Sequence, residues 1–225
     1  MLTSFSRLVF PHFSFRSVLV NLDPFAGDQA AAARCKDLLR TNFREAVVFE
    51  PMTPSFGGAV RRLWLHSQSD IVLHLEDDWL AVQRIERQAV ENLLVDRVKS
   101  VSLMCREKKW DGSSLLQKTT RKWRLFGKTV FRVEHNQFST SPSFIDGAFA
   151  RSCARLMNPA LDPEKQFSNG SNPALQRFAE RYQNRFLIGN DGPDIVVDIG
   201  RDWREQRKIV KRLVAGTSVW SSDNG

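Results

Sequence analysis

Residues 69–80 read Ser-Asp-Ile-Val-Leu-His-Leu-Glu-Asp-Asp-Trp-Leu, and this stretch decides the fold class. A run of β-forming residues, Ile71 to Leu75, ends abruptly in three consecutive acids, Glu76, Asp77 and Asp78. A short apolar run bounded by polar residues is typical of a buried strand in a parallel sheet. Open α/β sheets bind their ligands outside the carboxyl ends of such strands. The sequence therefore predicts an α/β fold with a ligand site at residues 76–78.

The three acids also indicate the kind of ligand. Adjacent carboxylates repel one another, so crowding three of them is costly without a compensating cation. A hard divalent ion such as Mg²⁺ or Mn²⁺, shared with a diphosphate, would compensate them. The alternative is a solvated acidic turn after a strand, because a short motif out of context often has no ligand at all.

Composition predicts one globular domain. The chain has 225 residues, 42% of them hydrophobic and 26% charged, which suits a single domain with a sizeable core. No apolar run approaches the roughly 18 residues of a membrane span, and the start lacks the apolar segment of a signal peptide. The three cysteines, Cys35, Cys105 and Cys153, are odd in number and far apart, so we expect reduced thiols in the cytoplasm.

Basic and aromatic residues gather between Arg106 and Glu134. This segment holds nine Lys or Arg against three Asp or Glu, a net +6 out of the chain's +8. Cations that meet phosphates and rings that stack on bases are typical of a nucleic-acid-binding surface. The alternative is a solvated hairpin whose aromatic residues pack on the domain. The candidate DNA contacts are Lys108, Lys109, Trp110, Arg121, Lys122, Trp123 and Arg124.

The apolar pattern predicts strands and helices that alternate along the chain. Strands are expected at residues 17–23, 46–50, 71–75, 101–105 and 194–198. Helices are expected at residues 27–43, 57–67, 82–99, 148–156, 173–186 and 202–213, with a further helix start at Asp162-Pro163-Glu164. The last dozen residues are expected to be disordered.

Taken in order, these motifs resemble those of GT-A glycosyltransferases. An early strand ends at Asp23, a glycine-opened helix follows, and a later strand ends in the acids at 76–78. Downstream, Ser141-Pro-Ser-Phe-Ile-Asp-Gly147 resembles the glycine loop of that superfamily, and Glu164 resembles its catalytic carboxylate at a helix start. Asp198-Ile-Gly-Arg-Asp-Trp203 occupies the place of its C-terminal metal and diphosphate motif.

The resemblance implies a fold and a division of the chain. The fold is a GT-A-like (Rossmann-like) mixed, mainly parallel sheet flanked by helices in one domain, residues 1–213. Residues 1–105 would form the half that binds the nucleotide sugar, and residues 106–213 the acceptor and catalytic half. Residues 214–225 would be a disordered tail.

Within the superfamily, the Leu-Glu-Asp-Asp-Trp and Gly-Arg-Asp-Trp signatures most resemble phage DNA-modifying glycosyltransferases, which are similar to the base J glucosyltransferase. This resemblance implies a UDP-sugar donor, UDP-glucose first, a Mn²⁺ or Mg²⁺ cofactor, and duplex DNA with hydroxymethylated pyrimidines as acceptor. A phage enzyme of this kind would work in the host cytoplasm. Two departures stand out: Asp198 replaces a frequent His, and the chain begins where a first strand with a Thr/Arg loop is expected.

The resemblance also assigns roles to individual residues. Asp78 would bind the metal directly, Asp77 would be a second ligand or a ribose contact, and Asp198 would be the third ligand. Glu76 would orient the site, and Asp23 would bind the base or the ribose. Further nucleotide-sugar contacts would be Thr3, Arg7, Gly147, Arg201 and Lys211. Arg201 and Lys211 could instead be ordinary surface cations, the more so Lys211.

An inverting transfer needs a carboxylate that takes the proton of the acceptor hydroxyl. Glu164 is the first candidate, Asp162 the second and Asp146 the third. The alternative for Glu164 is an acid that only stabilises a helix start through the helix dipole.

Two other functions remain open. One is the same chemistry on a polysaccharide or lipopolysaccharide acceptor, with the positive charge binding anionic sugars or a membrane surface. The other is a nucleic-acid-binding α/β domain without catalysis.

Overall fold

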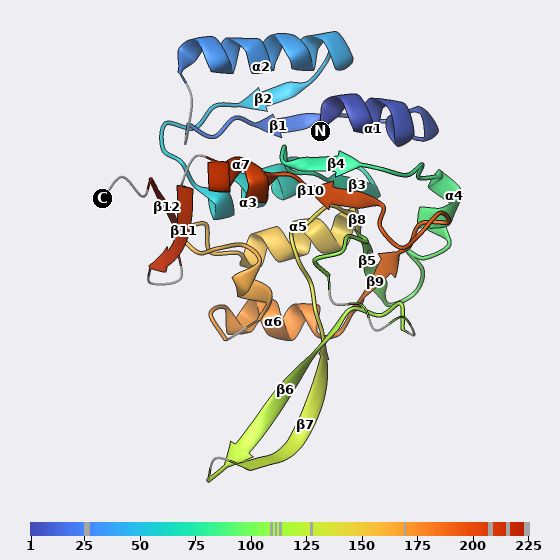
Figure 1. Ribbon diagram of the computed structural model, residues 1–225, viewed down its shortest axis with the longest axis vertical. Coiled ribbons are helices and arrows are strands. Elements are labelled where there is room, and N and C mark those ends of the chain that lie inside the picture. Colours follow the sequence, from blue (N-terminus) through green and yellow to red (C-terminus); the bar gives the residue numbers. More distant parts are fainter. Residues whose placement is uncertain are drawn as a thin grey trace.

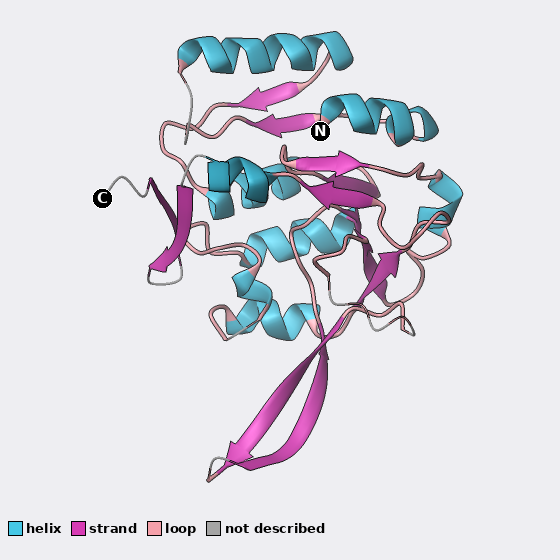
Figure 2. Cartoon of the chain, in the orientation of Figure 1, coloured by secondary structure: helices cyan, strands magenta, loops and turns pink. Residues whose placement is uncertain are grey.

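The computed structural model describes residues 1–24, 28–108, 110, 112, 114–126, 128–168, 170–206, 209–214 and 217–222 (Figure 1). Of residues 121–124, 132, 133, 201, 204, 209–214 and 217–222, only the backbone is described. The chain forms a mixed α/β single domain built from several small sheets (Figure 2).

The largest sheet has four strands in the order β3 (Ile71–His74), β8 (Ser143–Asp146), β5 (Val98–Leu103), β9 (Gln183–Leu187). Strand β8 runs antiparallel to both of its neighbours, and only β5 and β9 are a parallel pair. The expectation of a mainly parallel, Rossmann-like sheet is therefore wrong. The reason lies in the connection: β8 follows a long hairpin, whereas parallel neighbours need a crossover, usually a helix.

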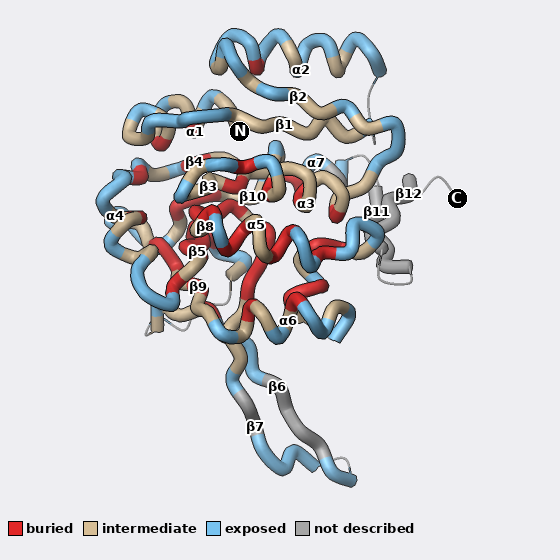
Figure 3. Tube along the Cα trace, turned by 180° about the vertical axis from the view of Figure 1, so that it is seen from behind, coloured by how far each residue is buried: buried red, intermediate tan, exposed pale blue. Residues whose placement is uncertain are grey.

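Alternate residues of β8 enter two different cores. Phe144 packs in the cluster of Phe5 and Val101, and Ile145 packs in the cluster of Trp64 and Phe149. This alternation is the period of a strand buried on both faces. Most of the second cluster comes from three helices and one 3-10 turn: α3 (Phe56–His66), α5 (Gly147–Leu156), α6 (Pro173–Ala179) and η2 (Lys165–Phe167). The buried residues lie at the centre of the domain in Figure 3.

A separate parallel pair, β1 (Leu19–Asn21) and β2 (Val47–Phe49), is connected through helix α2 (Gln29–Asn42). Asp28 begins α2 by accepting a hydrogen bond from Ala31 N at 2.7 Å. This β1–α2–β2 unit lies along one side of the domain, with α2 outermost and largely exposed (Figures 1 and 3). Among its residues, only Leu39 of α2 is buried. Helix α1 (Leu2–Leu8) and the turn η1 (Phe10–His12) precede the unit.

The prediction of a helix at residues 82–99 is wrong. Strand β4 (Trp79–Ala81) pairs with β10 (Val196–Asp198), and helix α4 covers only Arg87–Glu91. Backbone amides in this stretch bind distant partners instead: Val82 N donates to Ile195 O and Ile85 N to Leu8 O. Asp96 has a φ of 51°, which ends any helix there. Helical spacing of apolar residues was overruled by tertiary hydrogen bonds.

Two other expected helices are too long. The one expected at 173–186 ends at Ala179, and the chain then forms β9. The one expected at 202–213 is α7 (Gly200–Gln206) followed by strand β11 (Ile209–Val214). Strand β12 (Thr217–Ser222) pairs with β11 where a disordered tail was expected, and residues 223–225 lie outside the described residues. In these regions the chain forms strands because it pairs with strand partners.

Candidate functional site

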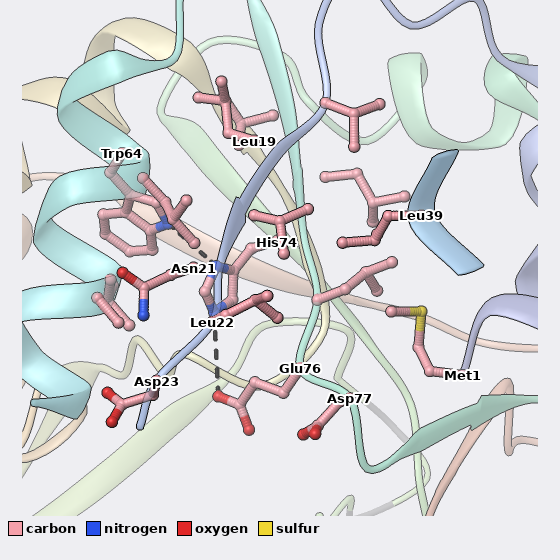
Figure 4. Close-up of a pocket in the computed structure, with 18 of the residues that line it drawn as sticks. Met1, Leu19, Asn21, Leu22, Asp23, Leu39, Trp64, His74, Glu76 and Asp77 are labelled. Carbon is pink, nitrogen blue, oxygen red and sulfur yellow. Dashed lines mark hydrogen bonds and ion pairs between the residues drawn. The ribbon is translucent and has the colours of Figure 1, made fainter. Parts of the chain in front are cut away.

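A cavity of about 2360 Å³ opens beside the carboxyl end of β3 (Figure 4). Residues of β1, α2, α3 and β3 line it, among them Leu19 and Leu39. Its other wall is acidic: Asp23, Glu76 and Asp77 stand on one side of it in Figure 4. The ligand position predicted from the strand end is thus an open space with an apolar part and an acidic part.

The two acidic motifs meet at this cavity. Strand β10 pairs with β4, which puts Asp198 opposite Trp79, the neighbour of Asp78. Ile199 N donates to Asp78 O at 2.8 Å, and Gly200 N donates to Asp198 Oδ1 at 2.8 Å. A Cβ on Gly200 would overlap the Asp78 carboxylate, so only glycine allows this approach. The structure therefore brings together the two motifs that the sequence places far apart.

Burial and like charges act on Asp78. Desolvation by burial, and after it repulsion from Glu76, Asp198 and Asp77, together raise the pKa of its carboxyl to about 6. A carboxylate in this setting is stabilised by any cation that binds beside it. Its neighbour Asp77 is exposed at the cavity wall.

The donor set suits a hard divalent cation in its chemistry. Asp77, Asp78 and Asp198 offer carboxylate oxygens, the ligands that Mg²⁺ and Mn²⁺ prefer. In the described part of the chain, however, no three acidic, histidine or cysteine side chains are already arranged around one point. These acids fit a metal that is held partly by its substrate, which is the usual arrangement for Mg²⁺ with a diphosphate.

Asp23 and Asn21 at the end of β1 each keep one buried polar atom without a partner. Asp23 Oδ2 accepts a hydrogen bond from Ser55 N at 2.9 Å, while its Oδ1 is buried without a partner. Asn21 Oδ1 accepts from Arg62, while its Nδ2 is likewise buried without a partner. Both residues line the cavity. The sequence pointed to Asp23 but not to Asn21, although residues two positions apart along an extended chain face the same side.

His74 and Trp64 form a buried hydrogen-bonded pair beside Glu76 that was also missed. Trp64 Nε1 donates to His74 Nδ1 at 3.2 Å, and His74 Nε2 lies 3.9 Å from Glu76 Oε1 (Figure 4). An indole N–H can only donate, so it fixes the histidine as the Nε2–H form facing the carboxylate. A single histidine on an apolar strand offers no sequence signal of this role.

The three candidate bases lie in different places. Asp162 is buried and lines the cavity, and its Oδ1 accepts from the backbone N–H groups of Glu164 and Lys165, both at 3.1 Å. Glu164 lies close enough to Lys108 to influence the charge of its ammonium. It is not among the residues that line the cavity.

The structure does not bring Asp146 to the site. Asp146 pairs with Ile71, the first residue of β3, whereas the acidic cluster follows the last. Its Oδ1 accepts from Phe149 N at 2.8 Å as the N-cap of α5, and its Oδ2 binds Lys99 Nζ at 3.1 Å. Gly147 lies at the same remote end, packed against Ser69 O. The reason is the direction of β8, whose antiparallel course carries its last residues away from the carboxyl end of β3.

The remaining predicted nucleotide contacts lie on helices and strands. Thr3 is exposed on α1 and lines the cavity, whereas Arg7 of the same helix is exposed outside it. Arg201 belongs to α7 and Lys211 to β11, and the side chains of both lie outside the described residues.

The candidate DNA contacts fall into two groups. Lys108 and Trp110 make internal bonds: Lys108 Nζ donates to Leu103 O at 2.7 Å, and Trp110 Nε1 to Ser114 O at 2.8 Å. Burial lowers the pKa of Lys108 to about 8. Both residues therefore serve the fold of this loop. The second group lies on strand β6 and consists of Arg121, Lys122, Trp123 and Arg124, whose side chains are outside the described part of the structure. Lys109 is outside it entirely.

Comparison of the chain with protein-family models, with curated proteins and with solved structures found no match in any of the three. Across its described residues, the chain has no helix with the length and apolar character needed to cross a membrane.

Proposed function

We propose that the protein is a metal-dependent glycosyltransferase that moves a sugar from a nucleoside-diphosphate sugar, UDP-glucose in the first instance, to an acceptor hydroxyl. The observation that carries this proposal is the meeting of Asp78 and Asp198 beside an open cavity. Burial and three neighbouring carboxylates raise the pKa of Asp78 to about 6, so this corner of the cavity favours a bound cation. The favoured acceptor is the hydroxyl of a 5-hydroxymethylpyrimidine in DNA.

The residues of the cavity would divide the work. Asp78 and Asp198, with Asp77, would hold Mn²⁺ or Mg²⁺, which supplies charge neutralisation for the departing diphosphate. Asp23 and Asn21 line the cavity, and Asp23 would bind the base or the ribose of the donor. The hydrogen-bonded pair of Trp64 and His74 would shape the cavity wall beside Glu76.

The transfer itself needs one proton acceptor. The acceptor oxygen bonds to the anomeric carbon, the bond from that carbon to the diphosphate breaks, and a carboxylate takes the hydroxyl proton. Glu164 and Asp162 are the two candidates for this role. Asp162 lines the cavity and caps a turn, whereas Glu164 makes no side-chain capping hydrogen bond and lies outside the cavity lining.

Nucleoside mass spectrometry tests the proposal. The protein is incubated with hydroxymethylated duplex DNA, Mn²⁺ and a mixture of sugar nucleotides, and we expect a nucleoside heavier by one sugar that EDTA abolishes. Asp78→Asn should give no product, whereas the exposed Asp191→Asn should act as wild type. Donor hydrolysis without a DNA product would favour a glycan acceptor. Neither donor hydrolysis nor product would favour a nucleic-acid-binding domain without catalysis.

A further inference from the structure

Strands β6 (Lys118–Leu125) and β7 (Lys128–Asn136) form a hairpin that stands clear of the domain (Figures 1 and 3). Its root is anchored: Gln117 N donates to Asn184 O at 2.9 Å, and Asn136 Nδ2 donates to Tyr182 O at 2.6 Å. Its tip projects away from the side on which the β1–α2–β2 unit lies (Figure 1). None of the described hairpin residues lines the cavity.

Phe126 at the tip is unfavourable for the stability of the fold in two ways, through the exposure of its side chain and through its backbone conformation. Its side chain is 95% exposed and its φ is 49°. Leu125 pairs with Lys128, so the turn has two residues, and at its first position Asn, Asp or Gly is strongly preferred. A bulky residue with positive φ is a genuine outlier, and such outliers point to a function. Leu125, beside it, is 60% exposed.

The hairpin is also strongly positive. Residues 118–136 contain six Lys or Arg and a single acid, Glu134. Glu134 is used at the root, where its Oε2 lies 2.8 Å from Lys118 Nζ. Strand register places Lys122 and Arg132 at the same level of the ribbon. A polyanion along the ribbon would compensate this positive charge.

We propose that the β6–β7 hairpin is an arm that enters the major groove of duplex DNA, with its cations at the phosphates and Phe126 against the bases. A two-stranded β-ribbon fits this groove, and cations spread along the ribbon can follow both phosphate backbones. The inference deepens the DNA acceptor of the proposed function. The arm would hold the duplex at a distance from the cavity and act as a tether.

Other partners fit the arm less well. Lys128 lies at the same level as the apolar tip, and a charged residue in the hydrocarbon of a membrane is costly. Duplex RNA has a deep, narrow major groove that a ribbon does not enter. A second copy of the arm would bring two strongly positive ribbons together. Duplex DNA is complementary to the arm in both charge and shape.

The test measures binding of the full chain to a short unmodified DNA duplex by fluorescence anisotropy, without donor or metal. Phe126→Asn should weaken binding severalfold, because it removes the apolar contact of the tip with base edges in the groove. Its Tm should stay the same or rise, because Asn suits the positive φ. Lys128→Gln should reduce the log–log salt slope by about 0.9. The matched controls, Val82→Asn and Arg44→Gln, change an exposed apolar residue and an exposed cation of the domain and should bind as wild type.

Several results would overturn the proposal. These are unchanged binding in Phe126→Asn and Lys128→Gln, equal affinity for duplex RNA, preferential binding to vesicles of anionic phospholipid, or a dimer that Phe126→Asn dissociates. Because no donor is present, DNA binding can succeed while sugar transfer fails, and the reverse. The proposed chemistry and the proposed arm are thus tested separately.

Discussion

The acidic end of β3 and the β6–β7 hairpin have opposite charges in opposite settings. At β3, four carboxylates gather beside a cavity, and the backbone around Asp78 and Asp198 is held by short hydrogen bonds. On the hairpin, cations lie along a ribbon that touches the domain only near its root and exposes Phe126 at its tip.

The two regions differ in how their charges are compensated. A half-buried carboxylate such as Asp78 is costly to the folded protein and favours a cation at a defined point. Lys118 and Lys128 of the hairpin are exposed, and its spread of positive charge suits an extended polyanion. The first setting suits the small ligand proposed above, and the second suits the proposed large partner.

The largest effect is expected for the proton acceptor of the proposed sugar transfer. Glu164→Gln keeps size and hydrogen bonding but cannot take a proton, so it should lower kcat by roughly two to four orders of magnitude. Donor binding should remain. Asp162→Asn is the matched comparison, and its Tm must be recorded as well because Asp162 also caps a turn. If Asp162→Asn loses kcat at unchanged Tm while Glu164→Gln does not, Asp162 is the base.

A smaller effect separates the two ends of β3. Asp146→Ala should lower the free energy of unfolding by about 1–2 kcal/mol, because α5 loses its N-cap. Donor binding should be unaffected, because Asp146 lies at the end of β3 remote from the acids. Asp146→Asn retains a capping oxygen and serves as the control. Chemical denaturation and donor titration of the three proteins measure both quantities, and lost donor binding at native stability would return Asp146 to the site.

The elements that could be predicted are those whose local pattern and tertiary partners agree. The pattern of residues 17–75 predicted β1, α2, β2, α3 and β3, and the caps Asp28 and Ser55 are local signals. The region after Asp78 could not be predicted. There the apolar spacing is helical, but Val82 and Ile85 give their amides to Ile195 and Leu8, which no local pattern contains.

The candidate site was predictable to the same extent. The acids at 76–78 were chosen because strand ends mark ligand positions, and Asp198 because residues 198–203 resemble a C-terminal metal motif; their role as ligands stays a prediction. Asp146 was misplaced because the direction of β8 depends on its partners in the sheet. The link from Trp64 through His74 to Glu76 depends on a contact between α3 and β3, which the sequence does not indicate.

Asp78→Asn should stabilise the protein while it removes metal-dependent donor binding. The folded pKa of about 6 lies above the ordinary 3.8, so the ionised carboxylate costs folding free energy above about pH 6 and nothing below about pH 4. The gain of the variant should therefore grow from pH 4 to pH 6 and then level off. After allowance for partial exposure we expect about 1–2 kcal/mol at pH 7.5. Denaturation at several pH values checks this, and a gain that is independent of pH would contradict it.

The smallest effect is expected for Glu134→Gln, which removes the only acid of the hairpin. Its ion pair with Lys118 is exposed, so the free energy of unfolding should change by less than about 1 kcal/mol. Removal of one negative charge near the proposed DNA path should tighten duplex binding slightly at low salt, and this gain should vanish as salt screens it. The isosteric change Glu91→Gln, in the exposed ion pair with Arg87 on α4, is the control. If both variants tighten DNA binding equally, net charge alone explains the effect, and the result does not support the hairpin as the DNA contact.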